Sequence, residues 1–182
     1  MNTEGMALYD KMEGWDLPQA VVEWSFAEMR RRGEDGAEGI AFWAGRAEGA
    51  IARVSHAFIV RGRHVLCRRG ILELESSLVN DLTDEVLTRG LYLIGQVHSH
   101  PPGASVRMSD TDQRYGIVAP SYLSVIVPDF AGGEWQKRST WGVHVYGPAR
   151  RWRTLPTTEA LQRIAISERE AELVTIGEGP DA

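Results

Sequence analysis

The chain has 182 residues, of which 43% are hydrophobic, and its 25 acidic and 20 basic side chains give a net charge of −5. This composition fits one globular domain with a substantial core, and the negative charge argues against a general nucleic-acid binder, which would show a basic surface. One cysteine excludes a disulfide framework and suits a reducing cytoplasm, and no apolar run approaches the ~20 residues of a membrane span. We therefore expect a cytoplasmic protein that contacts neither membrane nor nucleic acid.

The apolar pattern predicts one domain over 16–175, between a polar lead at 1–15 and a polar tail at 176–182. Asp16 is expected to cap a first helix that runs to about Arg32. Further elements follow in chain order: strands near 39–44, 50–60 and 64–74, a helix at 76–89, strands at 91–97, 122–127, 141–147 and 151–154, and a helix from about Thr158 toward Gly177. Such a mixture suggests an α+β (mixed α/β) domain with one central sheet flanked by helices.

Two histidines lie at the end of the strand predicted at 91–97. Side chains alternate between faces in an extended chain, so His98 and His100 project from the same side, and Pro101 then ends the strand. Ser109 is a good helix N-cap, and the first helical turn places Ser109 and Asp112 on one side. Two imidazoles and one carboxylate are the protein ligands of a catalytic zinc, whose fourth position stays open for water.

The spacing of these residues separates several families that contain His-x-His. Amidohydrolase barrels need about 250 residues, cupins need a Glu soon after the second His, and metallo-β-lactamases continue with an Asp-His where this chain has Pro102-Gly103. Zinc nucleobase deaminases need a Pro-Cys-x-x-Cys element, and Cys67 is the only cysteine. The pattern Glu…His-Ser-His-Pro…Ser-x-x-Asp closely resembles that of the JAMM (MPN-plus, Mov34/JAB1) zinc metalloproteases.

The resemblance covers roughly residues 18–155 and implies a JAMM/MPN domain with cytidine-deaminase-like architecture. The gap between His100 and Ser109 is one residue longer than the usual family gap, which we interpret as an expanded surface loop. This leaves Asp110 as an alternative ligand, although Ser-x-x-Asp favours Asp112. The family also has a catalytic Glu before a short buried strand, and Glu38 stands at that place.

Three other acids compete with Glu38 for the catalytic role. Glu34 and Asp35 lie in a polar turn, and Glu48 follows the strand, so position relative to the strand selects Glu38. Glu38 is expected to take a proton from the attacking water and to deliver it to the departing amine. Ser109 is expected to stabilise the oxyanion, a role that competes with its N-cap role for one oxygen.

The resemblance implies cleavage after the C-terminal Gly of a ubiquitin-like modifier. The chain is similar to compact bacterial members, many of which belong to operons with E1- and E2-like proteins, including antiviral conjugation systems. Another bacterial branch releases sulfur-carrier proteins from precursors, and the sequence does not separate the two. A scaffold module of the MPN-minus kind and a zinc hydrolase of small molecules remain as alternatives.

The other candidates have weaker support from the sequence. His56, His64 and His144 lie in or beside strand-like segments, where an isolated histidine is usually structural, and we take Cys67 as structural too. The loop from Asp129 to Thr140 is expected to border the substrate groove through Trp135. Packing of this side chain on the core is an equally good interpretation.

Overall fold

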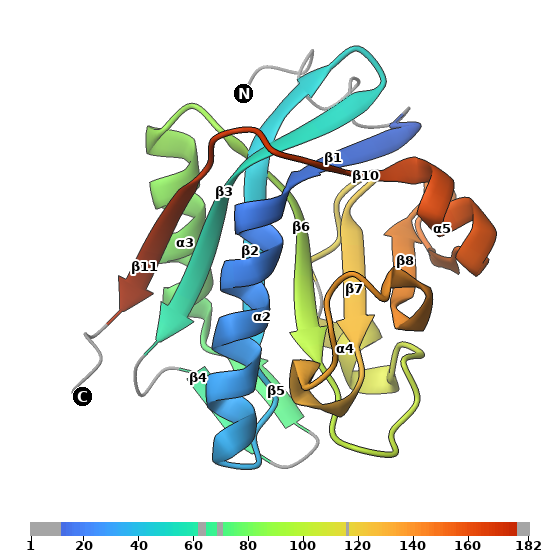
Figure 1. Ribbon diagram of the computed structural model, residues 1–182. Coiled ribbons are helices and arrows are strands. Elements are labelled where there is room, and N and C mark those ends of the chain that lie inside the picture. The colour runs from blue at the N-terminus through green and yellow to red at the C-terminus, as the bar shows by residue number, and fades with distance from the viewer. Residues whose placement is uncertain (1–11, 62–64, 69–70, 116, 178–182) are drawn as a thin grey trace.

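The computed structural model describes residues 12–61, 65–68, 71–115 and 117–177, in which nine strands form one mixed sheet with helices on both faces (Figure 1). In chain order its elements are β1 (Gly14–Pro18), α2 (Gln19–Glu34), β2 (Ile40–Glu48), β3 (Ile51–Arg61), β4 (Val65–Arg68), β5 (Ile71–Leu74), α3 (Ser76–Thr88), β6 (Tyr92–Ser99), α4 (Asp110–Tyr115), β7 (Leu123–Val127), η1 (Asp129–Ala131), η2 (Arg138–Thr140), β8 (Gly142–Tyr146), β9 (Trp152–Thr154), α5 (Thr157–Arg163), β10 (Ile164–Ser167) and β11 (Glu172–Gly177).

The strand order brings the ends of three neighbouring central strands together. The order is β10-β1-β3-β2-β6-β7-β8-β9, with β11 beside β3 and a separate β4–β5 hairpin. β6 and β7 are parallel, whereas β2 runs antiparallel to β6 with Ile40 opposite His98. The carboxyl ends of β6 and β7 therefore meet the amino end of β2.

Each face of the sheet has its own apolar core. The larger core joins the buried face of α2, including Val22, Phe26 and Met29, to the sheet. On the opposite face Leu82 and Val86 of α3 pack with residues of β2 and β3. The predicted α+β architecture, one mixed sheet flanked by helices, is confirmed.

The first predicted helix begins later than expected. Asp16 does not cap it: Asp16 lies in β1, where its carboxylate pairs with Arg53 and Arg169, and α2 starts at Gln19. All five residues of β1 are buried between β10 and β3. An interior strand of this kind lacks the alternation that marks a half-exposed strand.

The predicted last helix is wrong beyond Arg163. α5 ends there, and β10 and β11 occupy much of the region up to Gly177. Most of the expected polar lead and tail lies outside the described residues, although Gly14 and Trp15 belong to β1 and Ile176 and Gly177 to β11. Among the described residues, no helix has the length and apolar character that a membrane crossing requires.

Candidate metal centre and active site

Three predicted ligands converge at the carboxyl end of β6. His98 is the next-to-last residue of β6, His100 follows the strand, and Asp112 lies in the short helix α4. The two His Nε2 atoms are 3.2 Å apart. Asp112 Oδ1 lies 3.3 Å from His98 Nε2, and its Oδ2 lies 3.6 Å from His100 Nε2. The structure thus brings together side chains from two separate segments.

The spacing of these atoms is compatible with one shared metal ion. Two ligands about 2.05 Å from zinc at a tetrahedral angle lie about 3.3 Å apart, close to the 3.2 Å between the two His Nε2 atoms. Asp112 presents a different carboxylate oxygen to each histidine. His98 and His100 are buried, so the donor atoms face one another away from bulk water. Two nitrogens and one carboxylate oxygen form a possible metal site.

Hydrogen bonds within the cluster set its charges. Burial alone would raise the pKa of Asp112, but bonds from His100, His98 and the Ser109 N–H hold it well below its usual range. Burial alone would lower the pKa of His100, yet bonds to Asp112 and the Ser105 carbonyl outweigh it and raise that pKa. A metal ion needs neutral imidazole nitrogens, so it would compete with protons here.

The outer ring nitrogens of the two histidines differ in their surroundings. His100 Nδ1 lies 2.6 Å from the Ser105 carbonyl oxygen, to which it donates when Nε2 faces a metal. This bond fixes the tautomer and the ring orientation. His98 Nδ1 is buried and finds no hydrogen-bond partner within the described part of the chain.

Ser109 and Asp112 hold each other at the start of α4. The Ser109 N–H donates to Asp112 Oδ2 at 2.7 Å, and the Asp112 N–H donates to Ser109 Oγ at 3.1 Å. This reciprocal pair is a capping box. It aims the Asp112 carboxylate at the histidines, while Asp110 is exposed at the surface. The Ser109 hydroxyl accepts a bond in its cap role, so its own hydrogen is still available to a ligand.

Glu38 lies beside the cluster, just before β2. The Gly39 N–H donates to Ser99 Oγ and the Ser99 N–H donates to the Gly39 carbonyl, both at 3.0 Å. These two bonds fasten the residue after Glu38 to the strand that carries His98. Burial raises the pKa of Glu38, with a smaller effect of Asp112 in the same direction that the histidines oppose. The Glu38 carboxyl is thereby suited to proton transfer.

The competing acids lie elsewhere. Glu34 ends α2, Asp35 follows it at the surface, and Glu48 ends β2 in an ion pair with Arg53. None of them lines the cavity of about 410 Å³ beside the cluster. That cavity is lined by Glu38, His100, Pro101, Ala104, Ser105, Arg107, Met108, Ser109, Thr111 and Asp112.

His144 supports the loop between His100 and Ser109. It is buried on β8, with Nε2 3.1 Å from the Val106 carbonyl oxygen and Nδ1 3.0 Å from Thr154 Oγ1. Burial lowers the pKa of His144, so a neutral ring can donate to Val106 and accept from Thr154. A Cβ at Gly142 would overlap the same Val106 carbonyl. β8 therefore serves as the base on which this loop rests.

A strained turn supports the backbone of His100. The His100 N–H donates to the Val127 carbonyl, and the Phe130 N–H donates to the His100 carbonyl, both at 2.9 Å. All three residues of η1, which contains Phe130, have positive φ angles of 54°, 51° and 59°. From α2, Arg30 donates to the carbonyls of Ala131 at 2.7 Å and Gly133 at 3.0 Å. Sequence reasoning missed the roles of Arg30 and Ser99, and it took His144 as structural without predicting its contact with Val106.

The remaining predicted candidates lie away from the cluster. Trp135 is half-buried and packs against the larger core, which supports the second interpretation of this side chain. His56 lies on β3, where it contacts its neighbour Ser55 and Glu172 of β11. His64 and the side chain of Cys67 lie outside the described residues.

Comparison with known proteins gives one sequence relative and several structural neighbours. No family model matches the chain. The solution structure of protein DSY2949 from Desulfitobacterium hafniense aligns with a TM-score of 0.57 at 19% identity, over 86% of this chain and 94% of that one. The crystal structure of AF2198, a JAB1/MPN domain protein from Archaeoglobus fulgidus, aligns with a TM-score of 0.44 at 14% identity, over 85% and 98%.

The sequence relative is a curated protein, the "Probable metalloprotease y4jG" of Sinorhizobium fredii (strain NBRC 101917 / NGR234). It is 32% identical over 117 residues, which cover 63% of this chain and 71% of the relative. The name of the relative implies a metal, and the His98, His100 and Asp112 side chains are a group that could hold one. The chain therefore belongs to the same family as this probable metalloprotease.

Proposed function

We propose that this protein is a zinc-dependent isopeptidase or peptidase that cleaves after the C-terminal glycine of a ubiquitin-like modifier. The observation that carries the proposal is the convergence of two buried histidine nitrogens, 3.2 Å apart, with the Asp112 carboxylate beside a buried glutamate. His98, His100 and Asp112 would hold the ion. A bound zinc lowers the pKa of a water toward ~7 and polarises a carbonyl oxygen.

Glu38 would transfer the proton. Its burial raises the pKa of the carboxyl toward the working pH, which favours both taking up and releasing a proton. Glu38 would accept a proton from the attacking water and then give it to the departing amine. The Ser99–Gly39 bonds keep it next to the cavity without using its own oxygens.

Ser109 would stabilise the negative oxygen that forms during attack. Its Oγ accepts the Asp112 N–H, and its hydroxyl hydrogen can point into the cavity that Ser109 lines. The cap and the oxyanion role therefore use different parts of one hydroxyl group. Pro101 and Met108 also line this cavity, so a bulky side chain at the end of the modifier would collide with them.

The biological setting is part of the proposal. The motif is similar to that of compact bacterial members that work beside E1- and E2-like proteins, and the curated relative is itself bacterial. The proposed partners are a ubiquitin-like protein, its conjugates and such activating enzymes. The same chemistry would also release a sulfur-carrier protein from a precursor.

One set of variants tests the proposal. The wild-type protein is expected to hold about one zinc per chain, measured by elemental analysis, and to cleave a modifier with a C-terminal Gly from two unrelated targets. His98→Ala/His100→Ala should lose zinc and activity. Glu38→Gln should keep zinc and lose about 10²–10⁴-fold in rate, whereas Glu34→Gln should behave like the wild type.

The end of the modifier separates this proposal from others. Replacement of its last Gly by Val should slow cleavage by about 10²-fold, since ~1 Å of misplacement can cost that much. Equal cleavage of Gly and Val would contradict the deconjugase proposal and favour a sequence-specific peptidase. Wild-type protein without zinc would indicate a scaffold.

A further inference from the structure

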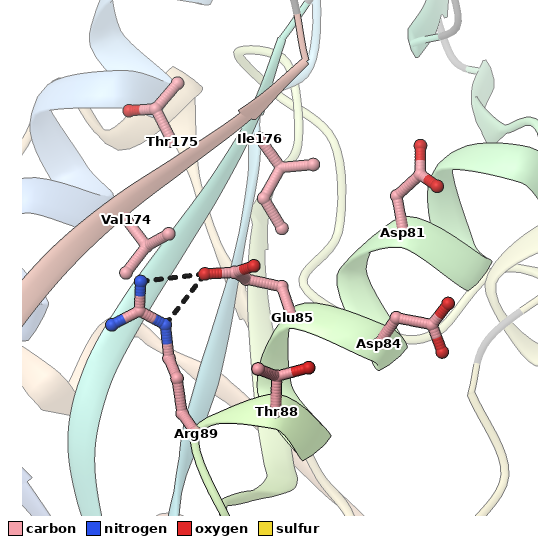
Figure 2. Close-up of a pocket in the computed structure, with 8 residues that line it drawn as sticks. All are labelled: Asp81, Asp84, Glu85, Thr88, Arg89, Val174, Thr175 and Ile176. Atoms are coloured by element: carbon pink, nitrogen blue, oxygen red, sulfur yellow. Dashed lines mark hydrogen bonds and ion pairs between the residues drawn. The ribbon is translucent and has the colours of Figure 1, made fainter.

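A second concave surface lies between α3 and β11. This groove has a volume of about 530 Å³. It is lined by Asp81, Asp84, Glu85, Thr88 and Arg89 of α3 and its cap, and by Val174, Thr175 and Ile176 of β11 (Figure 2). None of these residues lines the cavity beside Glu38, so the groove is separate from the candidate active site.

β11 offers an open backbone edge along this groove. Within the described residues it pairs only with β3, in parallel from Glu172 to Gly177. The backbone groups that point away from β3 are therefore available to a further strand. An extended segment of about six to eight residues would match the length of β11. Its backbone could continue the sheet by strand addition.

The groove is strongly acidic. Glu85 is paired with Arg89 at 2.7 Å (Figure 2). The same arginine lies 3.5 Å from Glu172. Asp81 and Asp84 are exposed and have no ion pair within the described part of the chain. These four acids against one arginine leave a local charge of about −3. Such a field attracts basic side chains and repels acidic ones.

The alternation of side chains along β11 determines what a partner strand would contact on each face of the sheet. Val174 and Ile176 pack toward the α3 core, so residues between them face the other side of the sheet. On that other side Leu173 is 46% exposed, a large apolar side chain at an edge. A strand added to β11 would therefore meet acids on one face and an apolar contact on the other.

We propose that this groove binds an extended, basic segment of a partner protein, with Lys or Arg alternating with apolar residues. A second copy of this chain would bring a second acidic groove and is disfavoured by charge. Residues 178–182 include Glu178 and Asp181 and no basic side chain, so this segment lacks the matching charge as well. The proposal does not depend on the metal site or its function.

Fluorescence polarisation with labelled peptides of about eight residues tests it. An alternating Lys-Val peptide should bind at low salt, and an alternating Glu-Val peptide should not. Asp81→Asn/Asp84→Asn should weaken binding about tenfold, since two exposed pairs are lost. The matched control, Glu34→Gln/Asp35→Asn, removes the same charge from an exposed site at the end of α2 and should bind like the wild type.

Two further measurements separate strand addition from charge alone. Two peptides are compared, one N-methylated at the odd-numbered amides and the other at the even-numbered amides, and one of the two should fail to bind because its methyl groups block the hydrogen bonds to β11. Hydrogen exchange of the β11 amides should slow when the unmodified peptide is bound. Binding that survives both N-methylated peptides, or that the Asp81/Asp84 variant leaves unchanged, would overturn the proposal. A dimer in sedimentation that Thr175→Pro removes would assign the edge to a second copy and overturn it too.

Discussion

Arg30 should control metal affinity although it belongs to a helix on the face opposite α3. Its guanidinium binds the carbonyls of Ala131 and Gly133, and Ala131 ends the η1 turn, in which all three residues have positive φ angles. The same turn donates the Phe130 N–H to the His100 carbonyl. Arg30→Met removes both donors and keeps most of the aliphatic stem. We expect it to loosen the turn and, through it, the position of His100.

The magnitude follows from the bonds and the strain. A hydrogen bond from a charged donor contributes about 1.5–3 kcal/mol, and we take ~2 kcal/mol for both because Arg30 is exposed. A non-glycine residue in the left-handed region costs about 1–2 kcal/mol, so three such residues cost roughly 3–6 kcal/mol, and the contribution of Arg30 offsets only part of this strain. We expect metal affinity to fall about tenfold, the lower end for residues that support ligands.

Zinc affinity is measured by competition with a chromophoric chelator, and melting of the metal-free protein reports stability. Arg30→Met should lower the melting temperature by roughly 4–8 °C, since ~1 kcal/mol corresponds to about 2–4 °C at this size. Arg151→Met is the matched control because Arg151 is exposed and its side chain has no bond in the described structure. An unchanged zinc affinity in Arg30→Met, or an equal loss in Arg151→Met, would refute the reasoning.

Three further variants test other contacts. His144→Ala should lower zinc affinity and reduce stability by about 1–3 kcal/mol, because it leaves the Val106 carbonyl unsatisfied. In the wild-type protein the pKa of His144 is lowered, so the stability that this side chain contributes should be complete above pH 6.5 and decrease as the pH falls, which melting curves would show. Burial would raise the pKa of Glu28, but hydrogen bonds from arginines on α2 and β3 lower it, so its contribution to stability should be complete above pH 4.5 and be lost in acid. Glu28→Gln should lower the free energy of unfolding at pH 7 by about 3 kcal/mol. Denaturant unfolding curves of this variant should no longer show the loss of stability in acid. Ser99→Ala should keep zinc by elemental analysis and reduce turnover about tenfold, because Glu38 loses one of its two anchors; a parallel loss of zinc would contradict this.

The sequence predicted those parts of the fold whose pattern is local. The two-residue period near His98 and the four-residue spacing of Leu78, Leu82 and Val86 both correspond to observed elements. β1 has no alternation because it is buried throughout. The prediction of a helix at β11 was wrong for the opposite reason. None of the residues of β11 is fully buried, so the sequence pattern did not distinguish a polar strand from the polar end of a helix.

The residues of the candidate site also differ in how far a local sequence pattern predicts them. Strand alternation alone places His98 and His100 on one side, and the resemblance to the family motif adds Asp112 from a separate helix. Arg30 is 101 residues from the carbonyl that it binds, and His144 is 38 residues from its own partner. Contacts of this kind depend on strand order and turn geometry, which one sequence does not contain.

Ser99 shows how the motif connects the two halves of the site. The alternation that points His98 and His100 to one side turns the residue between them to the other. There the Ser99 hydroxyl and N–H bind both backbone groups of Gly39. A Cβ at Gly39 would press on the Met29 backbone of α2, so this close approach requires glycine. The residue between the histidines therefore sets the distance between the ligands and Glu38. In the proposed mechanism, metal binding by the histidines and proton transfer by Glu38 would both depend on this pair of adjacent strands, and a change in their register would move Glu38 away from the histidines.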